Sequence, residues 1–283
     1  MRPSSFEIFG SLLRANSGLV IGPEKLYLLE VRLGPILKRE GLADLDALAD
    51  ALRRPAKADL VRTVVEAMTT NESFFFRDDK PFAHVRAAAL PALLAARAPG
   101  SPIRVWSAAS SSGQEAYSLA MIVADLRAAT AAHRVEILGT DIAREQLSRA
   151  AEGLYSQFEV QRGLPMQMLV KNFHREASGW RISEALRRMV QFREWNLLSD
   201  LRPLGRFDIV FCRNVLIYFD QPTKARVLEA IARQIAPDGF LYLGGSETVL
   251  GITDRFVPLA GERGVYALSP AAQPVHPARA AAA

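Results

Sequence analysis

The stretch IRVWSAASSSGQEAYSLAM, residues 103–121, decides the fold because it passes from a strand pattern to a helix pattern within one short turn. Its first part is an apolar run of strand length, and small residues around Gly113 lead into a helical stretch. Comparable apolar runs follow at 135–141, 207–214 and 239–247, with helical stretches between some of them. This order predicts an α/β fold with a parallel sheet and crossover helices.

Residues 1–80 have a different pattern and are predicted to form a small N-terminal helical domain. Gly41 and Pro55 fall near the breaks between its helices. Apolar residues recur there at helical spacing in three stretches, 27–42, 43–54 and 58–70.

The sheet domain is expected at 81–268. Its pattern loosens at about 154–195, where we expect a β-subdomain insertion. Within it, WRIS (180–183) and MVQFREW (189–195) are predicted to be short antiparallel strands. The Pro/Ala-rich tail at 269–283 is expected to be disordered.

Composition excludes several classes of protein. The chain has 283 residues, of which 49% are hydrophobic and 23% charged, as in ordinary globular proteins. No apolar run approaches the ~20 residues that span a bilayer, so we expect no membrane insertion. The single cysteine, Cys212, excludes an intrachain disulfide and fits a reducing cytoplasm. The histidines lack metal-ligand spacing, so no metal site is expected: His84, His133, His174 and His276.

Two strand ends suggest a ligand site. Small residues around Gly113 would let the backbone approach a ligand closely, and Asp141 ends the next strand, where an acid can bind ribose hydroxyls. Together they suggest a nucleoside-containing cofactor. The turn matches neither the dinucleotide nor the P-loop glycine pattern. Alternatively, it is a plain strand–helix turn and Asp141 caps a helix.

Two further segments carry unusual patterns. NESFFFRDDKPF, residues 71–82, places three phenylalanines between polar groups, which fits neither a helix face nor an alternating strand. FDIVFCRNVLIYFD, residues 207–220, reads as a buried strand ending in Arg213 and Asn214. Taken by themselves, these two residues could also be an ordinary strand-end arginine and a helix cap.

In combination, these segments resemble those of the chemotaxis receptor methyltransferases, the CheR-type S-adenosylmethionine-dependent protein-glutamate O-methyltransferases. The resemblance covers about residues 5–268. It implies a Rossmann-like class I methyltransferase sheet behind the helical domain. The segments that carry it, in the family's order, are NESFFFRD, WSAASSSGQEAYSLAM, GTDIAREQLSRAAEGLY, NLL at 196–198, FDIVFCRNVLIYFD and LYLGGSETV.

The resemblance also implies a reaction. S-adenosylmethionine would methylate glutamate side chains of methyl-accepting chemotaxis receptors, giving glutamate methyl esters and S-adenosylhomocysteine in sensory adaptation. A glutamate is ionised at neutral pH, since its reference pKa is about 4.3, so no general base is needed. Arg77 and Arg213 are expected to bind and orient, not to transfer protons, and either could attract the substrate carboxylate.

The cofactor-binding residues expected from the strand ends and the resemblance lie in five segments. Arg77 is also the residue to which we assign orientation in catalysis, with a surface salt bridge to Asp78 or Asp79 as the alternative. Phe74 to Phe76 are expected to be wedged between the two domains, with Tyr218 shaping the pocket. The full cofactor set is Asn71, Ser73, Arg77, Gly113, Glu115, Asp141, Asn196, Leu197, Arg213 and Asn214.

This sequence departs from the family's pattern at three places. Gln114 and Ala116 replace a common glutamate and proline after the glycine turn, and Gly245 stands where a histidine is common. Because Glu115 remains, cofactor binding is expected to survive. The Gly245 departure puts in doubt any role of the missing histidine.

The expected partner is the cytoplasmic coiled coil of the receptors, which would recruit a cytoplasmic, monomeric enzyme to receptor arrays. A basic cluster in the helical domain could meet its acidic surface, although a solvated helix face is as good a reading: Arg53, Arg54, Lys57 and Arg62. The stretch HREASGWRIS (174–183) is short, so we expect independence from a receptor C-terminal pentapeptide.

Two other classes of protein are the alternatives. A nucleic-acid methyltransferase would carry an Asn/Asp-Pro-Pro-Tyr/Phe stretch where residues 213–216 read Arg-Asn-Val-Leu, and no basic, aromatic-interleaved surface stands out. We therefore expect no nucleic-acid partner. A non-catalytic descendant that binds the cofactor and signals through a partner also remains open.

Overall fold

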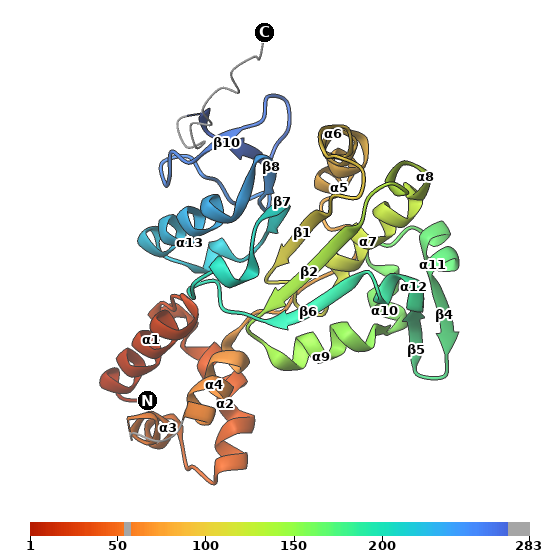
Figure 1. Cartoon of the computed structure of the whole chain (residues 1–283). Helices are drawn as coiled ribbons and strands as arrows, with labels where there is room; N and C mark the ends of the chain where they lie inside the picture. Colours follow the sequence, from red (N-terminus) through yellow and green to blue (C-terminus); the bar gives the residue numbers. More distant parts are fainter. Residues whose placement is uncertain (54–57, 271–283) are drawn as a thin grey trace.

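The computed structural model describes residues 1–53 and 58–270. Figure 1 shows a helical domain at the N-terminus, at the lower left, and a sheet domain above it. The expected tail lies outside the described residues beyond Pro270, as do Arg54 and Lys57 of the basic cluster.

The helical domain has its own core. It consists of α1 (Pro3–Ser17), a 3₁₀ turn (Pro23–Lys25), α2 (Leu26–Glu40), α3 (Leu45–Leu52) and α4 (Ala58–Met68). Glycines in the left-handed conformation end the first two helices, Gly18 with φ 76° and Gly41 with φ 64°. The apolar faces of these helices pack on one another around Phe9, Leu33 and Val64, which are fully buried.

The large sheet has the strand order β6-β2-β1-β7-β8-β10-β9. Its first five strands in this order pair in parallel, and β10 and β9 are antiparallel. The strand order reverses between β1 and β7: the chain continues from β1 to β2 and β6 on one side, and from β7 to β8 on the other. Ligands of α/β sheets bind at such a point of reversal. The strands are β1 (Ile103–Ala108), β2 (Val135–Asp141), β6 (Val190–Glu194), β7 (Phe207–Cys212), β8 (Ile235–Tyr242), β9 (Phe256–Pro258) and β10 (Val265–Leu268).

Helices cover both faces of this sheet because its strands are apolar on both sides. Ile209 and Phe211 belong to the core on one face, and Val210 and Cys212 to the core on the other. The helices on the first face are α5 (Lys80–His84), η2 (Val85–Ala89), α6 (Leu90–Ala96), α7 (Gln114–Asp125) and the short α8 (Arg127–Thr130); α13 (Gln221–Gln234) covers the second. The predicted α/β fold with a parallel sheet and crossover helices is therefore confirmed.

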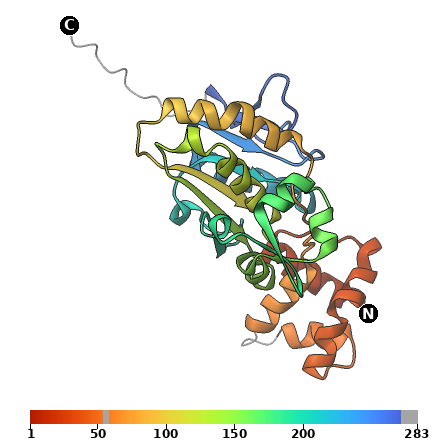
Figure 2. The ribbon, with the colours of Figure 1, turned by 90° about the vertical axis from the view of Figure 1, so that its right-hand side faces the viewer.

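The helical domain lies beyond the carboxyl ends of β1 and β2 (Figures 1 and 2). Its contacts with the sheet domain include the Val20 N–H, which donates to the Tyr218 carbonyl at 2.9 Å. Ile142, just after β2, packs against the core of the helical domain. The two domains thus meet at the edge of the sheet where a ligand is expected.

The insertion after α9 (Arg144–Glu152) forms a small antiparallel sheet of order β3-β5-β4, as predicted. WRIS contributes to β5, but the prediction for MVQFREW is wrong, because these residues form β6, which pairs in parallel with β2. The elements of the insertion are β3 (Leu154–Tyr155), α10 (Gln157–Gln161), α11 (Met166–Asn172), β4 (Phe173–Glu176), β5 (Gly179–Ile182) and α12 (Glu184–Arg187).

The phenylalanines of the 71–82 segment are not wedged between the helical and sheet domains as expected. Phe75 packs edge-on against Tyr155 and Phe173 of the insertion, with ring centroids 5.0 and 5.5 Å apart. Phe76 lies in the same core, 5.4 Å from Phe82. This segment is therefore anchored in the sheet domain, and Phe74 lies half-buried at the pocket.

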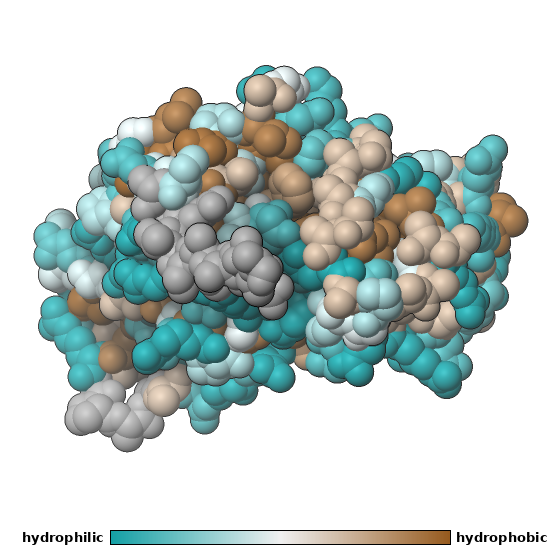
Figure 3. All heavy atoms as spheres, turned by 45° about the horizontal axis from the view of Figure 1, so that its top comes forward, coloured by the Kyte–Doolittle hydropathy of each residue, from teal (hydrophilic) through white to brown (hydrophobic). Residues whose placement is uncertain are grey.

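The surface is mixed. Hydrophobic residues appear in groups among hydrophilic ones on the face drawn in Figure 3. No helix among the described residues is long and apolar enough to cross a membrane. Likewise, no group of three or more His, Cys, Asp or Glu in residues 1–53 and 58–270 could hold a metal ion.

Candidate active site

A pocket lies at the carboxyl ends of β1, β2, β6 and β7, and the helical domain closes one of its sides. Its empty space of about 990 Å³ includes open solvent at the mouth. Among the predicted cofactor residues, those that line it are Asn71, Ser73, Arg77, Glu115, Asp141, Asn196, Leu197, Arg213 and Asn214.

Gly113 is not among the residues that line this pocket. Its φ of 91° and the space around it explain why a glycine stands there: a Cβ would lie 2.9 Å from that of Ala150 and 3.0 Å from the ring of Phe192. Gly113 therefore lets α7 begin directly behind β1, close to α9 and β6. Packing of the turn under the pocket therefore requires a glycine here, and contact of Gly113 with the cofactor stays a prediction.

The backbone around the pocket is strained. In the described chain, the residues other than glycine with positive φ are Phe76, Asp78, Asp79, Ala109, Ser111 and Asn214. All of them lie in the 71–82 segment or in the loops after β1 and β7. Such conformations persist where the surrounding structure fixes them, and they cluster at functional sites.

Asp141 joins two of the pocket loops. One carboxylate oxygen accepts the Ser111 N–H at 2.8 Å and the other the Ala143 N–H at 2.9 Å. Ala143, not Asp141, is the N-cap residue of α9, so the helix-cap alternative does not apply. Burial raises the pKa of Asp141, although its backbone hydrogen bonds act in the opposite direction.

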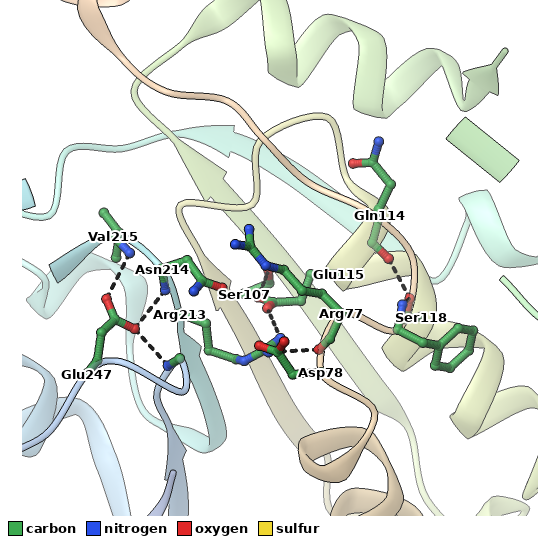
Figure 4. A network of polar contacts seen from close by, with 12 residues as sticks. Arg77, Asp78, Ser107, Gln114, Glu115, Ser118, Arg213, Asn214, Val215 and Glu247 are labelled. Atoms are coloured by element: carbon green, nitrogen blue, oxygen red, sulfur yellow. Dashed lines mark hydrogen bonds and ion pairs between the residues drawn. The ribbon is translucent and has the colours of Figure 1, made fainter. Parts of the chain in front are cut away.

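Arg213 is the centre of a buried ion-pair network, drawn in Figure 4. Its side chain, which is 1% exposed, donates to Glu115 at 3.0 Å, to Asp78 at 2.7 Å and to the Arg77 carbonyl at 2.7 Å. Glu115 also accepts the Ser107 hydroxyl at 2.8 Å. Burial raises the pKa of Glu115, against the opposing effect of Arg213. Arg213 thereby ties the 71–82 segment to the start of α7.

Arg77 is bonded far less completely. Its guanidinium donates to the Glu72 carbonyl at 3.1 Å and lies 5.3 Å from the centre of the Phe74 ring. The alternative of a salt bridge to Asp78 or Asp79 is wrong for Asp78, which pairs with Arg213. Within residues 1–53 and 58–270, no carboxylate forms an ion pair with Arg77, so its charge faces the pocket.

Arg162 of the insertion lies on the same ring. Its guanidinium is 4.3 Å from the centre of Phe74 and pairs with Glu72. The neighbouring Gly163 lies so close to this wall that a Cβ would come within 2.1 Å of the Phe75 carbonyl oxygen. The insertion therefore supports the outer wall of the pocket.

The loop after β6 closes the adjoining side. Asn196 donates to the Asn16 carbonyl of the helical domain at 2.5 Å and accepts the Leu198 N–H at 2.9 Å. Leu197 packs on the core of the second sheet face. In the described chain, the buried Ser110 hydroxyl and Trp195 indole nitrogen lack partners although both residues line the pocket. These orphaned polar atoms and the apolar Leu197 fit a ligand with polar edges, such as S-adenosylmethionine.

Several pocket residues could not be predicted from the sequence. Ser17 and Leu19 come from the helical domain, and no periodic pattern marks them. Glu247 does not line the pocket but holds a loop that does, and its place just beyond the strand end in LYLGGSETV matches the rule applied to Asp141. Of the basic cluster, Arg53 is exposed and Arg62 pairs with Asp59 on its own helix.

Comparison with known proteins agrees with this arrangement. Residues 4–69 match the family model "CheR methyltransferase, all-alpha domain", and residues 71–265 match "CheR methyltransferase, SAM binding domain". Chemotaxis protein methyltransferase Cher2 of Pseudomonas putida is 36% identical over 89% of this chain and 92% of its own length. Chemotaxis protein methyltransferase 1 of Pseudomonas aeruginosa is 37% identical over 89% and 93%. The relative from Escherichia coli is 34% identical over 93% and 90%.

These matches cover the helical domain and the sheet domain in the order in which the structure presents them. They agree with the pocket in assigning S-adenosylmethionine as the cofactor. The chain belongs to the CheR methyltransferase family.

Proposed function

We propose that this methyltransferase acts in chemotaxis and transfers the methyl group of S-adenosylmethionine to glutamate side chains of methyl-accepting receptors. The products would be glutamate methyl esters and S-adenosylhomocysteine. Support for the chemotaxis role comes from the names of relatives that share 34–37% of their residues with this chain.

The proposal of an acidic methyl acceptor rests on the contacts that Arg77 makes. Its guanidinium lines the pocket and, within the described part of the chain, has a backbone carbonyl as its hydrogen-bond partner and no carboxylate. Arg213, in contrast, already holds Asp78 and Glu115. Of the two arginines, Arg77 is therefore the one with charge left to attract a substrate carboxylate.

The reaction asks little of the protein beyond position and charge. When bound, S-adenosylmethionine supplies a methyl carbon attached to a positively charged sulfur. A glutamate acceptor is ionised at neutral pH, because its reference pKa is about 4.3, and attacks without a general base. Asn71, Asp141 and Asn196 would hold the cofactor, and Arg77 would orient the acceptor. The joining of opposite charges is favoured where the pocket walls exclude water.

We also propose how the protein binds the receptor that carries the methyl-accepting glutamates. Arg53 and Arg62 of the helical domain would meet the acidic surface of a receptor coiled coil and bring a cytoplasmic monomer to the receptor arrays. Arg54 and Lys57 of the same predicted cluster lie outside the described residues. The hairpin between β4 and β5 turns over two residues, Ala177 and Ser178. Such a short turn supports docking that does not depend on a receptor C-terminal pentapeptide. Tight binding of an Asn-Trp-Glu-Thr-Phe-type peptide would overturn that part.

The test is to incubate the protein with methyl-labelled S-adenosylmethionine and receptor-bearing membranes, and then treat the labelled receptor with mild base. Carboxyl methyl esters release volatile labelled methanol, so methanol from the receptor band supports the glutamate assignment. Membranes without receptors serve as the control. Label that resists base would mean another acceptor atom. An absence of label together with calorimetric binding of S-adenosylhomocysteine would favour a non-catalytic binding protein.

A further inference from the structure

Glu247 holds the loop that follows β7. One of its carboxylate oxygens accepts the N–H groups of Asn214 and Gly244, both at 2.7 Å. The other accepts those of Val215 at 2.9 Å, Leu216 at 2.7 Å and Ile217 at 3.3 Å. Figure 4 shows this carboxylate beside Asn214 and Val215, with Arg213 nearby.

The backbone held in this way forms one side of the pocket. Asn214, Val215 and Tyr218 line it, and Asn214 has a φ of 58°. A 3₁₀ turn, η4 (Leu216–Tyr218), begins within the loop, and its first N–H groups have no partner inside the turn. The single carboxylate of Glu247 accepts hydrogen bonds from these donors. It thereby stabilises a strained backbone conformation that the loop would not adopt without this contact.

The neighbourhood of Glu247 is built for this contact. A Cβ on Gly244 would lie 2.7 Å from the Asn214 side-chain nitrogen and 2.7 Å from the Glu247 carboxylate. The close approach of the two loops at this point therefore requires a glycine. Val249, two residues on, is fully buried in the core of the second sheet face. The segment that carries Glu247 is thus anchored by Val249.

We infer that Glu247 is a positioning residue for the cofactor pocket. It is not among the residues that line the pocket, and it acts by holding Asn214, Val215 and Tyr218 in the arrangement that the cofactor meets. The inference concerns cofactor binding and therefore stands or falls separately from the identity of the methyl acceptor.

The variant Glu247→Gln tests it. An amide keeps the shape of the side chain but replaces one acceptor oxygen by an NH₂ group, which then faces backbone donors. We expect the Kd for S-adenosylhomocysteine, measured by calorimetry on the folded protein, to rise about tenfold or more, because several N–H groups of the wall lose their partner. Amides 214–217 should also exchange with solvent faster than in the wild type.

Val227→Ala is the control, since it removes apolar volume from the same core through helix α13, outside the segment that carries Glu247. It should lower Tm while leaving the Kd for S-adenosylhomocysteine within about twofold of the wild-type value. An unchanged Kd in Glu247→Gln, or an equal rise in both variants, would overturn the inference.

If Glu247→Gln does not fold, two further measurements decide. Gly244→Ala should weaken S-adenosylhomocysteine binding, because its methyl group would displace both Asn214 and Glu247. In the wild type, amides 214–217 should exchange slowly although they lie in a loop. Fast exchange of these amides in the wild type would contradict the positioning role.

Discussion

Strand β7 has an arginine–carboxylate cluster at each end, and the two clusters differ in how completely they are bonded. At the amino end, Arg97 uses all three of its nitrogens on Asp208 and Asp238, at distances from 2.5 to 3.1 Å. At the carboxyl end, Arg213 holds Glu115 and Asp78. Within the described residues, however, the buried Arg213 Nε has no partner.

The backbone differs in the same way. Asp78 and the neighbour of Arg213, Asn214, have positive φ, whereas Arg97, Asp208 and Asp238 are not among the described residues with this conformation. Arg97 is also the more exposed arginine, at 21% against 1% for Arg213. The same residue types thus hold helix α6 against the sheet at the amino end of β7 and hold strained pocket loops at its carboxyl end.

Replacing Arg213 should have the largest effect. Arg213→Met leaves Glu115 buried without its cation, and removal of one partner of a buried pair costs about 3–5 kcal/mol of unfolding free energy. Because Asp78 and the 71–82 segment are released as well, binding of S-adenosylhomocysteine should also be lost. Urea unfolding and calorimetry measure the two effects. A stable variant with normal binding would mean that the network is dispensable.

Arg97→Met should separate stability from binding. Asp208 is largely buried and loses charged hydrogen bonds, so we expect a loss of about 2 kcal/mol in urea unfolding. The Kd for S-adenosylhomocysteine should stay within about twofold, since this cluster lies at the opposite end of β7 and strains no loop. Weakened binding in Arg97→Met would erase the distinction between the clusters.

Arg77→Ala should show the reverse pattern at the pocket. Turnover or cofactor binding should fall more than about tenfold, which corresponds to 1.4 kcal/mol, because a charge that faces the pocket is lost. Stability should change by less than about 0.5 kcal/mol, since the side chain has few partners. The exposed Arg134, replaced by Ala, is the control. Near-normal activity in Arg77→Ala would contradict its proposed role.

The smallest expected difference between the two clusters is in how the stability of the protein depends on pH. Burial raises the pKa of Glu115 from its ordinary value of 4.5, so the folded state holds this proton more tightly than the unfolded chain. Its contribution to stability is full below about pH 4.5 and is lost as the pH rises through the raised pKa. The stability of the wild type relative to Glu115→Gln should therefore decline over this range of rising pH.

Asp238 should behave in the opposite sense. Its hydrogen bonds with Arg97 lower its pKa from 3.8, so its contribution is present above that pH and is lost as the pH falls through the lowered pKa. Comparing Asp238→Asn with Glu115→Gln in urea unfolding at several pH values checks both signs. Parallel pH profiles would show that the two ends of β7 are electrostatically alike.

Much of the fold could be predicted because strand, turn and helix patterns are local. The prediction for MVQFREW was wrong because β6 is the edge strand of the large sheet. Val190 is buried, and Gln191, Arg193 and Glu194 are exposed, so the pattern resembles that of a hairpin strand. The phenylalanines misled similarly, because an apolar run does not reveal which of two cores it enters. Periodicity reports burial but not the neighbour that supplies it.

The site was harder to predict than the fold. Arg77 and Arg213 are the same residue type, and their different roles depend on partners brought from Glu115 and Asp78 by folding. Gly113 was predicted to allow close approach of a ligand, and the structure adds a second reason for a glycine there, the nearby Ala150. Four of the five backbone N–H groups that donate to Glu247 lie 30 or more residues away, and no local pattern in the sequence specifies these contacts.

The positive φ angles of Ala109, Ser111 and Asn214 also bear on the entropy of binding. Their loops are ordered by Asp141 and Glu247 when the chain folds, so this conformational entropy is lost before any cofactor arrives. Binding then has little left to order in these loops and can proceed without waiting for them to rearrange. The ligand-free protein bears the cost as lower stability, and a saturating ligand should restore part of it as a higher Tm.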